Sequence, residues 1–299
     1  MSQLRALVKR NCKLFFKDKG MFFTSLITPL ILLVLYGTFL SNVYEESFLA
    51  ALTEAGATVP EKLINGCVGG ELVSSLLAVS CVTVAFCSNM LMVQDKVSGA
   101  RRDLTISPVR ASTLSLGYYI ASMLSTLLVC YTALAVCLLY LVKAGWYLNT
   151  TDVLFLMLDV FFLVQFGTAL SSIINHFLSS QGQISAVGTV VSAGYGFICG
   201  AYMPISQFSK GLQRVISFLP GTYGTSLLRN HALRGVFEEM ENIHFPDMVV
   251  EAIKDSVDCN LYFFDTKVEL EVMYLIMFIT AVVLIFACVL LNSLHKNTN

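Results

Sequence analysis

The feature that most constrains this chain is a series of apolar runs, each long enough to cross a lipid bilayer. A membrane-spanning helix needs about 20 predominantly apolar residues, and a lone strand could not satisfy its backbone hydrogen bonds in lipid. The runs show no alternation with a period of two, which disfavours a β-barrel. We therefore expect an all-α membrane protein with six transmembrane helices, at Phe22–Leu40, Gly69–Val93, Leu114–Val142, Val153–Ile174, Ile184–Gly200 and Glu271–Asn292.

Composition agrees with this interpretation. Charged residues make up 13% of the 299 residues and the mean hydropathy is +0.73, whereas a soluble domain carries about 25% charge. The formal net charge is −1, so no basic field favours nucleic acid as a partner. The first run is longer than the apolar part of a signal peptide and no cleavage site follows it, so we interpret it as a retained span.

The positions of lysine and arginine predict the orientation. Six of them lie between Arg5 and Lys19, and four lie in the loop 94–113 after the second run. Because positive residues near the ends of spans stay in the cytoplasm, both termini are predicted to be cytoplasmic, in the plasma membrane. The long segment 201–270 then lies outside the cell, as long segments cross regardless of their charge.

The first 19 residues predict an amphipathic helix. Leu4, Leu7, Val8, Leu14 and Phe15 share one side, and the cations lie opposite. This pattern is typical of a helix in the cytoplasmic interface with its cations towards anionic headgroups; a plain positively charged leader is the alternative. Residues 1–299 are expected to form a single transmembrane domain.

Sequence motifs of enzymes are absent. The chain has no Walker loop, no G-x-S-x-G and no H-E-x-x-H, so no catalytic residue is assigned and energy for any driven process must come from another subunit. The nine cysteines and four histidines lack metal-ligand spacing, so no metal site or cofactor is expected in this chain. Cys67 and Cys259 fall on the outer side, where they either form a disulfide or are two unrelated thiols.

The loop Gln94–Thr113 is the most informative stretch. Pro108 disfavours helix at Ser107, so the first half of the loop predicts a short charged helix suited to docking on a partner; an ordinary positively charged loop is the alternative. The pattern Asp95…Gly99-x-Arg101-x-x-Leu104-x-x-Ser107-Pro108-Val109 resembles the coupling loop of type-2 ATP-binding-cassette (ABC) exporter permeases, a family of drug, antibiotic and polysaccharide exporters. One departure is Val97, where family members often carry an acid. Further similarity is carried by Thr28-Pro29, Tyr36-Gly37 and Leu116-Gly117.

A second match follows the fifth run. The segment 204–230 is too apolar for a free loop, yet proline and glycine interrupt it, and such backbone is tolerated at membrane depth only when buried in protein. It resembles the outer-leaflet segment of the same family, so the resemblance implies a type V exporter fold with re-entrant helices between spans five and six. The residues that carry this match are Gly200, Pro204, Phe208, Leu219, Pro220, Tyr223, Leu228 and Arg229.

The resemblance also implies a mechanism. Two permeases, identical or related, would pair with ATPase subunits that hold ATP and Mg, and closure of the ATPases would push the coupling helix to drive alternating access. An amphipathic substrate, such as a drug, an antibiotic peptide or a lipid-linked molecule, would be exported. The residues expected to act in coupling are Asp95, Gly99, Arg101, Arg102, Leu104 and Pro108, and those expected to line the substrate path are Thr83, Phe86, Met90, Asp159, Ser192 and Tyr195.

Two further patterns leave alternatives open. Gly188, Ser192, Gly196 and Gly200 recur every four residues, which favours a helix-packing face over the general abundance of glycine in membrane helices. Asp159 lies inside the fourth run, where a carboxylate is a candidate functional site. The alternative to an ABC permease is therefore a secondary transporter or channel that uses Asp159; a membrane enzyme would need a reactive cluster that we do not find.

Overall fold

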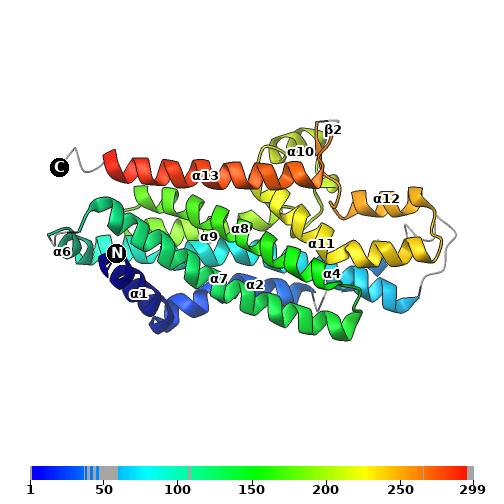
Figure 1. Cartoon of the computed structure of the whole chain (residues 1–299), viewed down its shortest axis with the longest axis horizontal. Helices are drawn as coiled ribbons and strands as arrows, with labels where there is room; N and C mark the ends of the chain where they lie inside the picture. Colours follow the sequence, from blue (N-terminus) through cyan, green and yellow to red (C-terminus); the bar gives the residue numbers. More distant parts are fainter. Residues whose placement is uncertain are drawn as a thin grey trace.

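The computed structural model describes residues 2–36, 38, 41–42, 45–46, 60–106, 109–264 and 266–294. Within them the chain forms an elongated helical bundle with one short hairpin (Figure 1), which confirms the all-α prediction. The elements are α1 (Ser2–Lys17), α2 (Lys19–Leu35), α4 (Glu61–Asn89), α5 (Leu91–Val97), α6 (Ala100–Ile106), α7 (Ala111–Ala144), α8 (Thr150–Phe177), α9 (Gln181–Ile198), the 3₁₀ turn η2 (Ile205–Gln207), α10 (Lys210–Ile216), α11 (Pro220–Asn242), α12 (Asp247–Ser256), β1 (Tyr262–Phe263), β2 (Thr266–Lys267) and α13 (Leu270–Leu294).

Helices occupy the described part of all six ranges predicted to cross the membrane, but not all of them qualify as spans. α9 falls short because its glutamines and glycines lower its hydropathy. Four helices qualify by themselves, and α1 and α2, which meet at 71°, add a fifth if they are taken as one broken span. The last residues of the first predicted span lie outside the described residues. Four helices are long and apolar enough: Glu61–Val97, which joins α4 and α5, Ala111–Ala144, Thr150–Phe177 and Leu270–Leu291.

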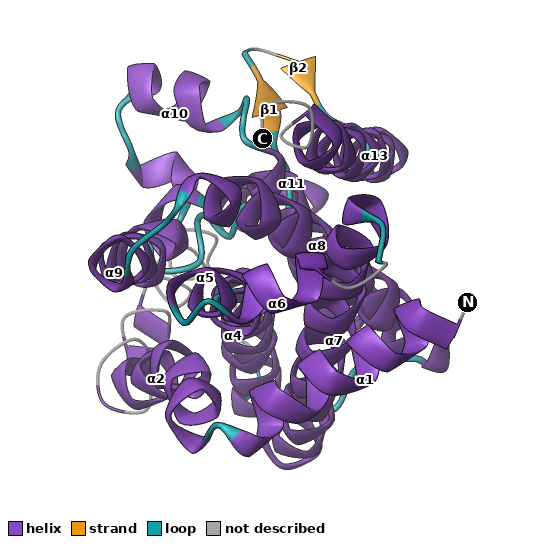
Figure 2. Cartoon of the chain, turned by 90° about the vertical axis from the view of Figure 1, so that its left-hand side faces the viewer, coloured by secondary structure: helices purple, strands orange, loops and turns teal. Residues whose placement is uncertain are grey.

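α4 is the axis of the bundle. Of its most apolar stretch, 94% is buried, against 17% for α13. Helices α2, α7, α8, α9 and α11 all pack against α4 and surround it when the bundle is viewed along its length (Figure 2). Small residues allow this close approach: Gly167 of α8 lies directly against the backbone of Cys81 and Val82.

The two ends of the bundle differ in what they hold. The α6 end also carries α1 and the C-terminal end of α13, whereas the α12 end carries the start of α4 (Figure 1). The arrangement therefore places both ends of the described chain on the same side of the bundle. Residues 43, 44, 47–59 and 295–299, where parts of the topology prediction fall, lie outside the described residues.

Local sequence signals set several helix boundaries. α8 begins with a capping box, in which Asn149 and Asp152 bond each other's backbone amides, and α9 begins with the equivalent pair Ser180 and Gln183. Pro220 occupies the first turn of α11, where its missing N–H costs nothing. These boundaries follow from the residue types alone.

The amphipathic N-terminal helix forms as predicted, but its apolar face is directed at the protein. Leu7 and Phe15 are buried in a cluster with Leu114 and Tyr118 of α7. Asp18 ends α1 and caps α2 by accepting a hydrogen bond from the Met21 amide at 3.1 Å. The face that periodicity alone would place in the membrane interface therefore covers the bundle.

The segment between α9 and α13 contains η2, α10, α11, α12 and the hairpin. α11 is one continuous helix of 23 residues, and no proline follows Pro220 until Pro246. Tyr223 of α11 donates a 2.5 Å hydrogen bond to the Ser217 carbonyl and so closes the turn after α10. Cys67 and Cys259 are buried in one apolar cluster but are free thiols.

We expect Gly235→Ala to destabilise the protein strongly. A Cβ at this position would collide with the backbone carbonyl of Tyr147, and a backbone atom cannot move aside as a side chain can. The matched control is Gly194→Ala, because open space surrounds that glycine and alanine favours helix by up to about 1 kcal/mol. Thermal unfolding in detergent is the measurement; equal melting temperatures for both variants would contradict the packing described here.

Candidate functional site

The turn between α5 and α6 projects from one end of the bundle. Gly99 has a φ of +83°, a conformation that favours glycine, and it reverses the chain between the two short helices. Arg102 is exposed, whereas Arg101 and Leu104 are half-buried. Pro108 lies outside the described residues.

Asp95 joins three helices at this end. Its carboxylate is buried and accepts two hydrogen bonds from the Arg10 guanidinium, at 2.7 and 3.1 Å, and one from the Tyr118 hydroxyl at 2.5 Å. The hydrogen bond to Asp95 raises the pKa of Arg10 above its usual value. Since a bidentate arginine–carboxylate pair fixes geometry as well as charge, Asp95 ties α5 to α1 and α7 and does not face outward.

Lys96 ties the same turn to α8. Its ammonium donates to three carbonyl oxygens at the end of α8, those of Asn175 at 3.1 Å, His176 at 2.7 Å and Leu178 at 3.1 Å. The last carbonyls of a helix have no partner within the helix and carry partial negative charge. The lysine therefore caps α8 from a different helix, a role that the sequence analysis did not identify.

Leu104 is the apolar residue of the turn that we expected to act in coupling, but other apolar residues of the turn are more exposed. Leu104 packs partly against the cluster that holds Leu7 and Phe15. Val97 and Ile106, by contrast, are 50% and 77% exposed. Both side chains are therefore accessible at the tip of a charged turn.

A second feature is a groove of about 960 Å³ along the bundle between α2, α4 and α9. Its wall on α4 and α5 includes Cys87, Met90 and Gln94, and Ser192 lies on the α9 wall. No charged side chain lines the groove among the described residues. The remaining lining consists of apolar groups and hydroxyls, with one further amide: Met21, Thr24, Ile27, Thr28, Ile31, Leu32, Leu35, Gln181, Ile184, Ser185, Gly188, Thr189, Ala193, Phe197 and Tyr202.

Of the residues predicted to line a substrate path, the structure brings two to this groove, Met90 and Ser192. Thr83 and Phe86 are buried inside the bundle, and Thr83 bonds its own helix at Val79. Tyr195 packs over Gly221. The resemblance assigned these side chains to the second and fifth predicted spans, but which of them face the groove depends on how the helices pack.

The four-residue stripe of small residues on α9 packs within the chain. Gly188 lies against the Met90 methyl group, and Gly196 lies against the Tyr202 ring. Gly200 ends the helix with a φ of +79°, as left-handed glycines often do. Tyr202 also donates a 3.3 Å hydrogen bond to the Ser192 carbonyl, so the chain after α9 folds back along the stripe.

Asp159 has partners that the sequence did not reveal. His231 Nδ1 lies 2.7 Å from one carboxylate oxygen, and the Tyr274 hydroxyl donates to the other at 2.5 Å. Phe155 stacks on the His231 ring at 4.8 Å. The carboxylate is buried and joins α8 to α11 and α13, away from the groove.

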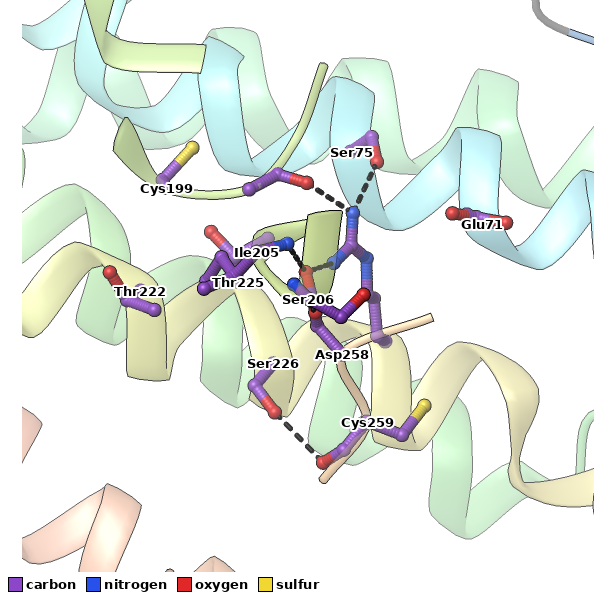
Figure 3. A network of polar contacts seen from close by, with 12 residues as sticks. Glu71, Ser75, Cys199, Ile205, Ser206, Thr222, Thr225, Ser226, Asp258 and Cys259 are labelled. Atoms are coloured by element: carbon purple, nitrogen blue, oxygen red, sulfur yellow. Dashed lines mark hydrogen bonds and ion pairs between the residues drawn. The ribbon is translucent and has the colours of Figure 1, made fainter. Parts of the chain in front are cut away.

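Arg229, predicted as part of the re-entrant segment, is the largest fully buried side chain described. It donates to Asp258 at 2.9 Å, to the Gly200 carbonyl at 2.5 Å and to Ser75 of α4 at 3.3 Å. The Asp258 carboxylate also accepts from the backbone amide of Ile205 at 2.7 Å, and Figure 3 shows these groups converging from separate segments. The network fixes the chain after α9 onto α4 and α11.

Glu71 lies on α4 in the same view and is 3% exposed (Figure 3). Among the described residues no group of three or more His, Cys, Asp or Glu side chains could hold a metal ion. The polar groups that do join helices include Asp159 and Arg229. A lone charged residue in an apolar run, such as Asp159 or Arg229, was the one signal that a partner had to exist elsewhere.

Comparison with known protein families gives one match. The family model described as ABC-2 type transporter matches residues 2–232, which is well over half of the chain. A search of curated proteins finds no match. The matched range includes the α5–α6 turn, the groove and the first half of α11, and residues 233–299 lie beyond it.

We expect Arg10→Ala to lower stability, because among the described residues it leaves the buried Asp95 carboxylate with Tyr118 as its only hydrogen-bond donor. A hydrogen bond to a charged group contributes about 1.5–3 kcal/mol. Arg5→Ala, on the exposed side of the same helix, is the matched control. Unfolding temperature in detergent would be compared for the two variants; if both melt like the unmutated protein, Asp95 does not depend on α1.

Proposed function

The chain belongs to the ABC-2 type transporter family and is a multi-pass permease subunit of an ABC transporter, and from this premise we propose that it exports an amphipathic substrate through the groove between α2, α4 and α9. A separate ATPase subunit, which binds ATP and Mg, drives the movement. The permease acts as a pair with a second copy or a related chain. Both termini face the cytoplasm across the plasma membrane, and segment 201–270 faces outward.

The uncharged lining of the groove is the observation that carries this proposal. A charged substrate would lose its hydration shell on entering the groove, and the described lining of the groove offers no opposite charge in return. Such a transfer costs several kcal/mol. Apolar walls with scattered hydroxyls suit a drug, peptide or lipid-linked molecule with a large apolar surface and few polar groups. The groove lies on the flank of the bundle, where a second permease would enclose it.

The α5–α6 turn is positioned to move both walls of this groove. α5 follows α4 after a single residue, Met90, which itself lines the groove. Through Asp95 and Arg10 the turn is also fixed to α1, and α1 leads directly into α2 on the other wall. A force on the turn therefore reaches α2 and α4 together, and through Lys96 it reaches α8.

The surface that receives this force is the exposed tip of the turn. Val97 and Ile106 provide apolar contact and Arg102 provides charge. Burying an isoleucine contributes roughly 1.5–3 kcal/mol, whereas an exposed ion pair contributes at most about 1 kcal/mol. We assign the anchor to Ile106 and a supporting role to Arg102 and Arg101, and Leu104 holds the turn on the bundle.

A secondary transporter or channel that uses Asp159 is not favoured by any specific contact. Asp159 is enclosed by His231 and Tyr274 and does not line the groove. The carboxylate therefore acts as a joint between helices.

Ile106→Asp should uncouple the transporter without unfolding it, because the side chain is 77% exposed in the permease alone. Loss of the buried contact predicts roughly 10–100-fold weaker binding of the ATPase. The measurements are co-purification with the cognate ATPase and substrate-stimulated ATP hydrolysis.

Met248→Asp is the matched control for this variant, since Met248 is 85% exposed on α12 at the opposite end. Leu104→Asp should reduce both stability and coupling. Full coupling in Ile106→Asp would remove the tip of the turn from the ATPase contact.

Ser192→Phe should block transport by filling the groove, while ATPase binding stays unchanged because the turn is untouched. Val136→Phe adds the same ring on α7, where the side chain is 61% exposed and away from the groove. Transport into inverted vesicles and basal ATP hydrolysis would be measured for both. Normal transport by Ser192→Phe would show that the substrate takes another path.

A further inference from the structure

A cluster of exposed aromatic rings lies beside the outer end of α13. Phe218, which follows α10, is 63% exposed, and its ring centroid lies 5.2 Å from that of Phe263 and 6.2 Å from that of Phe264 in the hairpin. Together with α10 these rings form what we call the outer lip: residues 210–219 and 262–264. Three contacting rings exposed to water would be costly, so the lip needs an apolar environment.

The position of the lip supplies that environment. The hairpin ends at Lys267, three residues before Leu270 opens α13, and the outward face of α13 exposes Leu275, Phe278 and Ile279. Figure 1 shows α10 and the hairpin at the flank of the bundle, next to the start of α13 and short of the α12 end. Trp and Tyr are enriched at this level, where the membrane meets water, and the apolar faces of segments that lie there carry Trp, Phe and Leu.

Two cations accompany the rings. Lys210 and Arg214 lie one helical turn apart on α10 and both are exposed. Neither forms an ion pair with a carboxylate among the described residues. The Arg214 guanidinium lies 5.5 Å from the Phe264 ring centroid, so charge and aromatic surface form one continuous patch.

Behind the patch is a cavity of about 260 Å³ that both cations line. Two carboxylates also line it. Asp258 is paired with Arg229, whereas Asp255 accepts hydrogen bonds from neutral groups, Asn260 at 2.7 Å and Tyr262 at 3.1 Å. Among the described residues, two cations therefore face one carboxylate without an ion pair, and the net charge at the cavity is positive. Neutral hydrogen-bonding groups complete its wall, namely Ser206, Gln213, Ser217, Thr222, Tyr223, Asn260 and Tyr262.

We propose that the outer lip is a binding site for an anionic phospholipid of the outer leaflet. Lys210 and Arg214 bind the phosphate, the cavity beside them holds the headgroup, and the three phenylalanine rings pack against the start of the acyl chains. The lipid holds α10 and the hairpin against the membrane at the base of α13. This site is separate from the groove and depends on the membrane position of α13, not on the direction of transport.

Lipid retention tests the site. Full-length protein would be reconstituted in nanodiscs of phosphatidylcholine and phosphatidylglycerol, extracted into neutral detergent, and its bound lipid counted by native mass spectrometry. Removing a cation near a membrane surface weakens binding of anionic lipid roughly fivefold, so Lys210→Gln/Arg214→Gln should lose phosphatidylglycerol roughly 25-fold more readily. Lys143→Gln, an exposed lysine at the end of α7, should behave as the unmutated protein.

Two outcomes of this experiment would overturn the proposal. One is equal retention of phosphatidylglycerol by the double variant and the unmutated protein. The other is complete displacement of the lipid by millimolar inorganic phosphate, because a free anion would then account for the site without the rings.

The depth of the lip is tested separately. Trp146 is the single tryptophan of the chain, so Trp146→Phe provides a silent background. In it, the emission of Phe263→Trp should be quenched by vesicles of phosphatidylcholine brominated on the acyl chains. Met248→Trp, on the exposed side of α12, should not be quenched. Absence of quenching at position 263 would place the lip in water and overturn the proposal even if the double variant folds poorly.

Discussion

A charged side chain inside an apolar bundle is tolerated only when another part of the protein neutralises or hydrogen-bonds it, and this requirement decides how the helices of this permease are joined. Asp95 is held by α1 and α7, Lys96 by the end of α8, Asp159 by α11 and α13, and Arg229 by the chain after α9. Apolar contacts alone would leave helices free to slide, because lipid is as apolar as the side chains. The polar contacts fix which helices are neighbours and at what height.

These polar contacts between helices lie towards the two ends of the bundle. At the α6 end they tie the coupling turn to α1, α7 and α8, and at the α12 end they tie α11 to α4, α8 and α13. Across the groove, α2 and α9 share no hydrogen bond or ion pair in the part of the chain that the structure describes. A change in the separation of α2 and α9 therefore breaks no described hydrogen bond between these two helices. Such a separation is what the proposed transport through the groove needs.

In the outer lip, the proposed partner of the charged and aromatic side chains is a lipid. Its rings and cations have few partners within the protein, unlike Asp95 or Arg229, and they lie where the bilayer supplies both an apolar phase and phosphate groups. A site satisfied by lipid would let the segment before α13 follow the membrane surface when the bundle rearranges.

The sequence by itself determined the class of molecule and its helices. Apolar runs longer than a bilayer is thick leave helices as the only solution, and the pattern from Asp95 to Pro108 predicts a turn for contact with an ATPase subunit. Helix starts at Asn149, Ser180 and Pro220 were equally local. The span count was less secure, because the glutamines of α9 and the break between α1 and α2 place both helices at the margin of what crosses a membrane.

Only the tertiary structure decided which way each side chain faces. The resemblance implied which helices line a path but not the direction of each side chain, so Thr83 and Phe86 were assigned to a path although they are buried in the bundle. Leu104 was expected to act in coupling, whereas Ile106 is the more exposed apolar residue of the turn. The partners of Asp159 lie 72 and 115 residues away along the chain, and no local pattern specifies contacts over such distances. Helix-capping hydrogen bonds and the lengths of apolar runs are determined by the local sequence. The pairing of buried charges depends on how the helices pack, which is a property of the whole chain.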